Sequence, residues 1–228
     1  MVTGEVITRT FQIFLGDASG TCFAIKAHGR MFYVTARHVL EGIESSPLAL
    51  NWNGQEVSLT VTGYRHHPTE DVSIFTGSGP MVDYSQKEDA CDLTAKGLGL
   101  GQDCYFLGFP FGLGGAVGEV NNHYPLPFVK RAIVSMLNFP GSDVFYLDGT
   151  NNPGFSGGPA VARSSPNRWS IFGVVSGYEG APEPVYNGDR DTGMHTKANS
   201  GLIRVVPIKF ALELIDEALT AAAVPLGA

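Results

Sequence analysis

The chain has 228 residues, 43% of them hydrophobic and 16% charged, which allows a buried core and excludes an intrinsically disordered protein. Its 22 acidic and 15 basic residues give a net charge of −7, so we expect no nucleic-acid partner, because phosphate binding requires clustered lysine and arginine. No apolar run approaches the roughly 18 residues of a membrane span and the N-terminus lacks a signal-peptide pattern, so we expect a cytoplasmic protein without a membrane partner.

Short β-prone runs dominate the first half of the sequence and are separated by glycine-containing turns. They cover residues 11–16, 21–27, 31–36, 56–65 and 72–77. One short helical turn is expected at 36–43, directly after a strand. The polar, turn-rich segment 77–102 is expected to join two halves of the chain.

The second half repeats this organisation and ends in a helix. Further β-prone runs cover residues 103–109, 131–137, 144–149, 160–163, 169–177 and 202–206. Segment 178–201 is predicted to be a functional or disordered loop, because compact domains rarely contain such a long connection without regular structure. In the tail 207–223 an apolar stripe recurs at helical spacing through Ile208, Ala211, Leu212, Ile215, Leu219 and Ala222. Closely spaced strands without helices between them predict an antiparallel all-β fold with a C-terminal helix.

The stretch NPGFSGGPAV, residues 152–161, places three glycines around Ser156. Glycine gives up side-chain packing and costs backbone entropy, so the cluster predicts a backbone of unusual shape. A serine hydroxyl becomes a good nucleophile when a base removes its proton, and the base works best when a third group orients it. Ser156 is therefore a candidate nucleophile that requires a histidine and a carboxylate.

His38 and Asp71 are the candidates for the base and the orienting acid. His38 follows the apolar strand FYVTA and opens a short helical turn, which would hold the imidazole in one place. The other histidines lie in turns, in polar loops or beside a proline, and we expect them to be solvated or structural. Asp71 stands directly before the apolar run VSIF, whereas Glu70 would point the opposite way. The order His38, Asp71, Ser156 is that of chymotrypsin-type peptidases.

Several motifs in the same order resemble trypsin-like serine peptidases, in particular the bacterial HtrA (Deg) protease domain without a PDZ domain. SGTCFAI resembles the family's SG-x-G-F-I strand, YVTARHVLEG the strand with the catalytic histidine, and EDVSIF the strand that follows the catalytic aspartate. FLGFPFGLGG and KRAIVSML resemble later segments, LDGTNNPGFSGGPAV resembles the nucleophile loop, and IFGVVSG and LIRVVPI match the closing strands. The resemblance covers nearly the whole chain.

The resemblance implies two antiparallel six-stranded β-barrels of the chymotrypsin type with the catalytic residues in the cleft between them. The N-terminal barrel would cover about 1–90, the C-terminal barrel about 100–206 and the C-terminal helix about 207–223. It also implies a serine endopeptidase that hydrolyses protein or peptide substrates through an acyl-enzyme, without a metal or an organic cofactor. The oligomeric state stays open.

The resemblance places the oxyanion hole in the loop formed by Gly154, Phe155 and Ser156. The backbone N–H groups of Gly154 and Ser156 would stabilise the negative charge that develops on the substrate carbonyl oxygen. The family has asparagine where this chain has Phe155, and chymotrypsin-like zymogens have an aspartate there that pairs with a newly cut N-terminus. Because Phe155 cannot form that ion pair, we expect no activation by N-terminal cleavage.

The substrate pocket would be lined by four residues of the second half, Thr150, Ser176, Gly177 and Tyr178. Thr150 would lie at the base of the pocket for the side chain that precedes the scissile bond. It carries no negative charge to attract arginine or lysine. We therefore expect a small or medium apolar residue at that substrate position.

Two other interpretations were weighed. A protease fold kept as a binding or sensor module with little hydrolysis is the main alternative, favoured by Phe155 and by the long segment 178–201. The glycine-rich stretches GLGLGQ and GLGGAVGEV lack the strand-to-helix context of a phosphate-binding loop.

The three cysteines are irregularly spaced, so they predict buried thiols instead of a zinc site or a disulfide framework.

Overall fold

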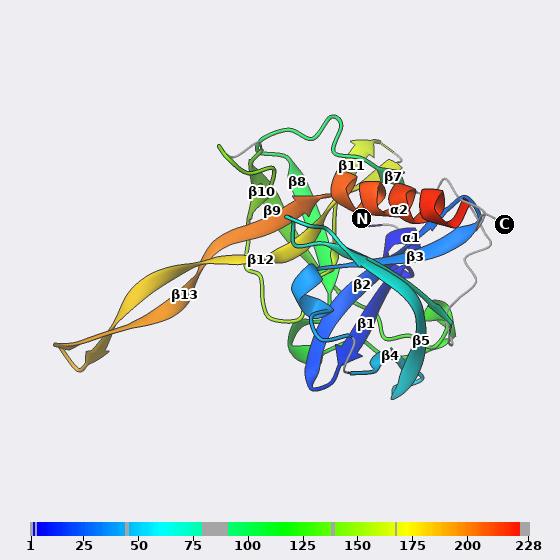
Figure 1. Ribbon diagram of the computed structural model, residues 1–228. Helices are drawn as coiled ribbons and strands as arrows, with labels where there is room; N and C mark the ends of the chain where they lie inside the picture. Colours follow the sequence, from blue (N-terminus) through cyan, green and yellow to red (C-terminus); the bar gives the residue numbers. More distant parts are fainter. Residues whose placement is uncertain are drawn as a thin grey trace.

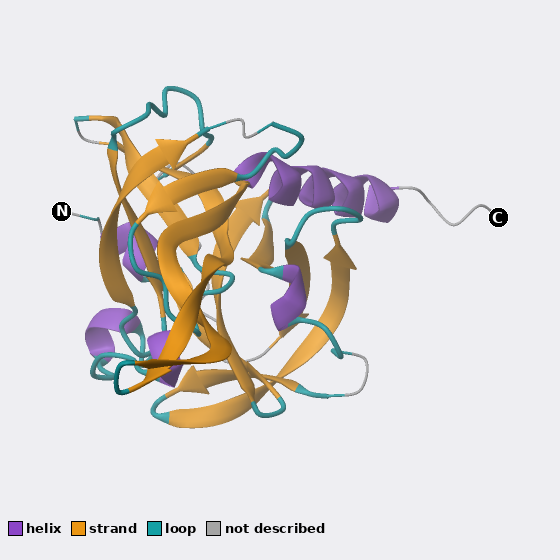
Figure 2. Cartoon of the chain, turned by 90° about the vertical axis from the view of Figure 1, so that its left-hand side faces the viewer, coloured by secondary structure: helices purple, strands orange, loops and turns teal. Residues whose placement is uncertain are grey.

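The computed structural model describes residues 2, 4–43, 46–78, 91–137, 140–166 and 168–223. The predicted connection 77–102 lies partly outside these residues. A four-residue helix, α1 (Gly4–Ile7), precedes the first strand. Strands form most of the structure that follows (Figure 2).

Six strands of the first half close into a barrel. They are β1 (Thr10–Leu15), β2 (Ala18–Ala27), β3 (Arg30–Thr35), β4 (Leu48–Trp52), β5 (Gln55–His66) and β6 (Ser73–Ser78). Their order around the barrel is β1-β2-β3-β6-β5-β4, and every pairing is antiparallel. The predicted strands of this half are present, and β4 is an additional strand that the sequence analysis did not identify.

The central barrel strands bury both faces, which explains their nearly continuous apolar sequences. On one face Phe11, Tyr33 and Phe75 pack together inside the barrel. On the other face residues such as Phe23 and Val34 join a core shared with the second half and the C-terminal helix. Residues that alternate along one strand therefore serve two different cores.

The second half forms a seven-stranded sheet. Its strands are β7 (Asp92–Leu93), β8 (Asp103–Gly108), β9 (Phe128–Met136), β10 (Phe145–Asp148), β11 (Pro159–Ser165), β12 (Arg168–Asn187) and β13 (Arg190–Pro207). The order is β11-β8-β9-β10-β13-β12-β7, and β11 also pairs with β12. All pairings are antiparallel except that of β12 with the two-residue strand β7. The predicted all-β fold is thus confirmed, with one closed barrel and a second sheet.

Residues 178–201 form most of a long hairpin and are not the irregular loop that was predicted. Strands β12 and β13 stay paired as far as Asn187 and Arg190, and the hairpin projects away from the body as an arm (Figure 1). The two-residue turn is Gly188-Asp189, with Gly188 at φ +63°, and Gly-Asp between two strands favours a tight hairpin turn. The prolines and glycines of this segment concealed the strands, although the turn signal was present in the sequence.

The C-terminal helix α2 (Ile208–Ala223) lies across the two halves. Buried residues of its apolar face join the shared core, namely Ile208, Phe210, Ala211, Leu214 and Ile215. The helix also contacts His67 of the first half, whose ring lies 4.8 Å from the Phe210 ring and whose Nε2 lies 3.7 Å from Glu213 Oε2. The predicted helix is confirmed. Among the described residues, no helix is long and apolar enough to cross a membrane.

Candidate active site

His38 lies where the first barrel gives way to a short 3-10 helix, η1 (Arg37–Val39). Strand β3 ends in buried residues, so the chain leaves the barrel at a fixed point. The Arg37 guanidinium donates hydrogen bonds to the backbone carbonyls of His67 (3.2 Å) and Pro68 (3.3 Å). These bonds tie the His38 segment to the chain that leads to Asp71.

Asp71 holds His38 through both its backbone and its ring. The His38 Nδ1 atom lies 2.9 Å from Asp71 Oδ2 and 3.1 Å from Oδ1, and the His38 backbone N–H donates to Oδ1 at 3.0 Å. The imidazole is 44% exposed and the carboxylate 27% exposed. With Nδ1 committed to Asp71, Nε2 is the ring atom that can accept a proton.

The Ser176 hydroxyl is a third partner of the Asp71 carboxylate. It donates to Asp71 Oδ2 at 2.6 Å, and Ser176 is only 7% exposed. The sequence analysis placed Ser176 in the substrate pocket and missed this contact. The only sequence signal was a serine at the end of the buried apolar run IFGVV.

These contacts shift the pKa values of both members of the pair. The hydrogen bond from His38 to Asp71 raises the His38 pKa above that of a free imidazole, although burial opposes the shift. Burial alone would raise the Asp71 pKa, but the hydrogen bonds from His38 and Ser176 reverse this and lower it. Asp71 therefore stays ionised and favours a protonated His38.

Ser156 contacts the same network through Ser176. Its hydroxyl donates to the Ser176 backbone carbonyl at 3.3 Å. Within the described residues, no hydrogen bond joins Ser156 to His38. Ser176 therefore contacts Ser156 through its carbonyl and Asp71 through its hydroxyl, and Asp71 in turn binds His38.

The loop before and after Ser156 leaves two N–H groups without an acceptor. The N–H groups of Phe155, Gly157 and Gly158 donate to backbone carbonyls of Asn152, Val175 and Phe155 at 3.3, 2.7 and 2.9 Å, respectively. In the described part of the chain, neither the Gly154 nor the Ser156 N–H has an internal acceptor. These two are the groups expected to face a substrate oxygen.

Two glycines let this loop pass close to neighbouring backbone, Gly154 beside Phe109 of the second half and Gly157 beside the first barrel. Gly154 has φ +101° and Gly157 has φ +85°, both in the region that disfavours residues with a Cβ. A Cβ on Gly154 would clash with the Phe109 carbonyl oxygen. A Cβ on Gly157 would clash with the Thr21 carbonyl oxygen and the Thr35 hydroxyl. The glycine cluster is thus required by close backbone contacts.

Thr21 of β2 fastens the loop to the first barrel. Its buried hydroxyl donates to the Gly154 carbonyl at 2.6 Å and accepts from the Phe109 N–H at 3.2 Å. Its backbone N–H donates to the Ser156 carbonyl at 2.9 Å. Sequence reasoning missed this residue, because nothing local to Thr21 indicates a partner 133 positions away.

Phe155 anchors the loop from the opposite side. Its side chain is fully buried, and its ring meets that of Phe106 edge-on at 4.8 Å between centroids. The position where an aspartate would need a charged partner is thus filled by apolar packing. That N-terminal cleavage does not activate this protein stays a prediction.

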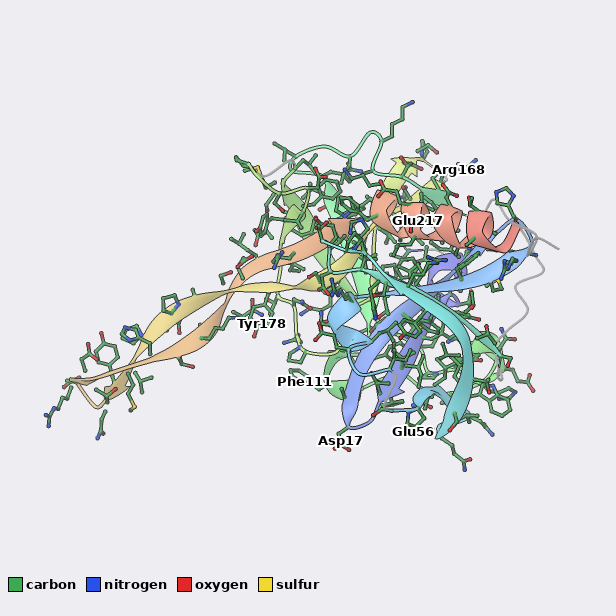
Figure 3. All side chains as sticks on the ribbon, in the orientation of Figure 1. Asp17, Glu56, Phe111, Arg168, Tyr178 and Glu217 are labelled. Atoms are coloured by element: carbon green, nitrogen blue, oxygen red, sulfur yellow. The ribbon has the colours of Figure 1, made fainter. Side chains whose placement is uncertain are left out.

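The four predicted pocket residues lie in two segments of the second half. Thr150 is exposed and follows β10, whereas Ser176, Gly177 and Tyr178 belong to β12. No atom lies within 4 Å of the position that a Gly177 Cβ would occupy. Tyr178 stands where the arm leaves the body (Figure 3). Among the described residues, no group of three or more histidine, cysteine or acidic side chains could hold a metal ion.

Comparisons with known proteins agree with this fold. The family profile described as the trypsin-like peptidase domain matches residues 20–168. A comparison with curated proteins gave no match. Among solved structures, the HtrA-type protease AlgW with a tripeptide has a TM-score of 0.63 and 19% identity, covering 96% of this chain and 62% of its own.

Two further solved structures show the same fold. The serine endoprotease from Yersinia pestis has a TM-score of 0.60 at 14% identity, covering 95% of this chain and 66% of its own. An inactive form of the Rv3671c protease of M. tuberculosis has a TM-score of 0.59 at 16% identity, covering 93% and 90%. This chain thus spans about three fifths of the length of AlgW.

Proposed function

The chain belongs to the trypsin-like peptidase domain family, and on this premise we propose that it is a serine endopeptidase with Ser156 as nucleophile, His38 as base and Asp71 as orienting acid. The proposal rests on the connected hydrogen bonds of these three residues through Ser176. The two free N–H groups of the serine loop support it. The ring of pairings from β11 round to β12 supports a second barrel.

In the proposed reaction Ser156 first exchanges its Ser176 acceptor for His38 Nε2. His38 takes the hydroxyl proton while Oγ attacks the peptide carbonyl carbon, and Asp71 stabilises the imidazolium that forms. The Gly154 and Ser156 N–H groups donate to the carbonyl oxygen as it gains charge. His38 then protonates the leaving amine, the C–N bond breaks, and an acyl-enzyme remains.

Water completes the cycle by the same steps. His38 accepts a proton from a water molecule, the hydroxide attacks the acyl carbon, and the bond to Ser156 Oγ breaks as the serine regains its proton. The oxyanion donors stabilise this second charged intermediate as well. Each of the two steps therefore uses the same three side chains.

We propose a protein or peptide substrate with a small or medium apolar residue before the scissile bond. Thr150 is the proposed pocket base and carries no carboxylate to pair with arginine or lysine. Ser176, Gly177 and Tyr178 would form one wall. The neighbour AlgW was solved with a tripeptide, which agrees with a peptide substrate for this fold.

The alternative is a protease fold that binds polypeptides and hydrolyses them little. The Ser156 hydroxyl favours it in one respect, because it donates to the Ser176 carbonyl and not to His38. A binding module would keep this arrangement. A peptidase would exchange it on binding substrate, since catalytic hydrogen bonds often tighten only in the complex.

A fluorophosphonate probe separates the two functions, because it reacts only with an activated serine. We expect labelling of the wild-type protein at Ser156, located by peptide mass spectrometry, and none of Ser156→Ala. Ser164→Ala is the matched control, since Ser164 is exposed and its hydroxyl contacts Asp92 away from the site. A folded wild-type protein that is neither labelled nor able to cleave unfolded casein would establish the binding module.

A further inference from the structure

Lys130 reaches from β9 to the segment that leads into the serine loop. Its Nζ atom donates to the backbone carbonyl of Thr150 and to Asn152 Oδ1, the latter at 3.2 Å. The ammonium also lies over the rings of Phe106 and Phe155, at 5.9 and 5.8 Å from their centroids. One side chain thus contacts three residues of segment 150–155.

The surroundings of Lys130 are unusual for a lysine. Within the described residues no carboxylate forms an ion pair with it, although the whole chain carries a net charge of −7. Its partners are a carbonyl, an amide oxygen and two ring faces. Partial burial lowers its pKa. A solvated surface lysine would make none of these contacts, so this geometry is specific to the loop.

The contacts of Lys130 continue directly to the expected oxyanion donors. Asn152, which Lys130 binds through its side chain, accepts the Phe155 N–H through its backbone carbonyl at 3.3 Å. Phe155, over which the ammonium lies, is the residue between Gly154 and Ser156. A shift of Asn152 or Phe155 would therefore rotate the peptide groups that carry both donors.

We infer that Lys130 is a positioning residue that holds the oxyanion loop with its Gly154 and Ser156 N–H groups directed at the substrate oxygen. The inference rests on the proposed peptidase function. Thr21 holds the loop from the first barrel and Lys130 holds it from β9, with the buried Phe155 ring between them. Both supports belong to the folded chain itself, so the loop requires no newly cut N-terminus.

Substitution of Lys130 tests this role. Lys130→Met keeps the length of the side chain and removes its charge and donors. We expect kcat for a peptide ester to fall roughly 10- to 100-fold, because small displacements of catalytic groups have effects of this size. KM should change less than about twofold, since the contacts act on the transition state. Lys130→Arg, which can donate to the same two oxygens, should retain clearly more activity than Lys130→Met.

Arg131→Met is the matched control. Arg131 is the next residue on β9, so its side chain points to the opposite face. It is 65% exposed, and its one ion pair among the described residues is with Asp103 on the surface. We expect wild-type kcat and KM from this variant. An equal loss of kcat in Arg131→Met and Lys130→Met would overturn the inference.

A second measurement tests Lys130 even if the peptidase proposal fails. Hydrogen–deuterium exchange of peptides covering 150–158 should become faster in Lys130→Met and stay unchanged in Arg131→Met. A wild-type protein without hydrolysis or labelling would refute the proposed function alone, and faster exchange would still support the role of Lys130 in holding the loop. Unchanged exchange, or unchanged kcat in an active wild type, would overturn that role.

Discussion

Replacement of Thr21 by valine separates the support of the loop from ordinary core packing. Valine keeps the shape of the side chain but removes the hydroxyl that bridges the Gly154 carbonyl and the Phe109 N–H. Thr21 is fully buried, so water cannot replace it. Each buried group left unsatisfied costs about 1–3 kcal/mol, and two are left here. We expect Thr21→Val to lower the free energy of unfolding by about 2–6 kcal/mol.

Thr10→Val is the control for this experiment. Thr10 is equally buried and lies on β1 of the same barrel. Its hydroxyl donates to one carbonyl, that of Val6 in α1, at 2.9 Å. Thr10→Val should lower the free energy of unfolding by about half as much as Thr21→Val, because one group is left unsatisfied instead of two. Urea titration gives both values.

The rate of fluorophosphonate labelling tests whether the Thr21 hydroxyl supports the oxyanion loop. At a temperature where both variants are fully folded, we expect Thr21→Val to label about 10- to 100-fold more slowly than wild type, because the loop that carries the oxyanion donors loses its anchor. Thr10→Val should label at the wild-type rate. The reasoning is refuted if Thr21→Val labels as fast as Thr10→Val, or if the two lose the same free energy of unfolding.

Two further predictions concern His38 and Gly154. Hydrolysis should decline on acidification with a midpoint above about 6.5, because Asp71 raises the His38 pKa and the protonated ring cannot act as a base; a pH–rate profile with a midpoint below 6 would contradict this. The stability that the His38–Asp71 pair contributes depends on pH in the opposite direction. It is fully present below about pH 6.5 and is lost as pH rises through the raised His38 pKa. Urea unfolding midpoints measured below and above that pKa would reveal the loss. Gly154→Ala should lower the melting temperature more than Gly97→Ala, since both have positive φ but only a Cβ on Gly154 meets the backbone of Phe109; equal shifts would show that backbone strain alone matters.

The sequence predicts what depends on local pattern. The β-prone runs and turns of the first half predict most of the barrel strands, and the helical stripe predicts α2. His38 and Asp71 could be selected because each stands at the end of an apolar strand, and the structure brings them within 2.9 Å of each other. The two residues are 33 positions apart and both border strands of the same barrel.

Contacts between distant segments could not be predicted in the same way. Ser176 and Asp71 are 105 residues apart, and the hydroxyl donor is an ordinary strand residue. Lys130 is likewise one of several basic residues, and only the folded chain shows that it approaches Phe155. The arm was missed for a different reason, because its prolines and glycines are typical of loops and outweighed the Gly-Asp turn signal.

The anchoring of the serine loop by Thr21 affects the order in which the molecule becomes competent. During synthesis the β2 strand leaves the ribosome early, and the loop that it must hold follows 133 residues later. A nascent chain that ends before Ser156 therefore carries the anchor without the serine, and no nascent chain carries the serine without the anchor. If the peptidase proposal holds, a partly unfolded copy in which these hydrogen bonds are broken cannot digest its neighbours, because the same bonds that join the halves also hold the oxyanion donors.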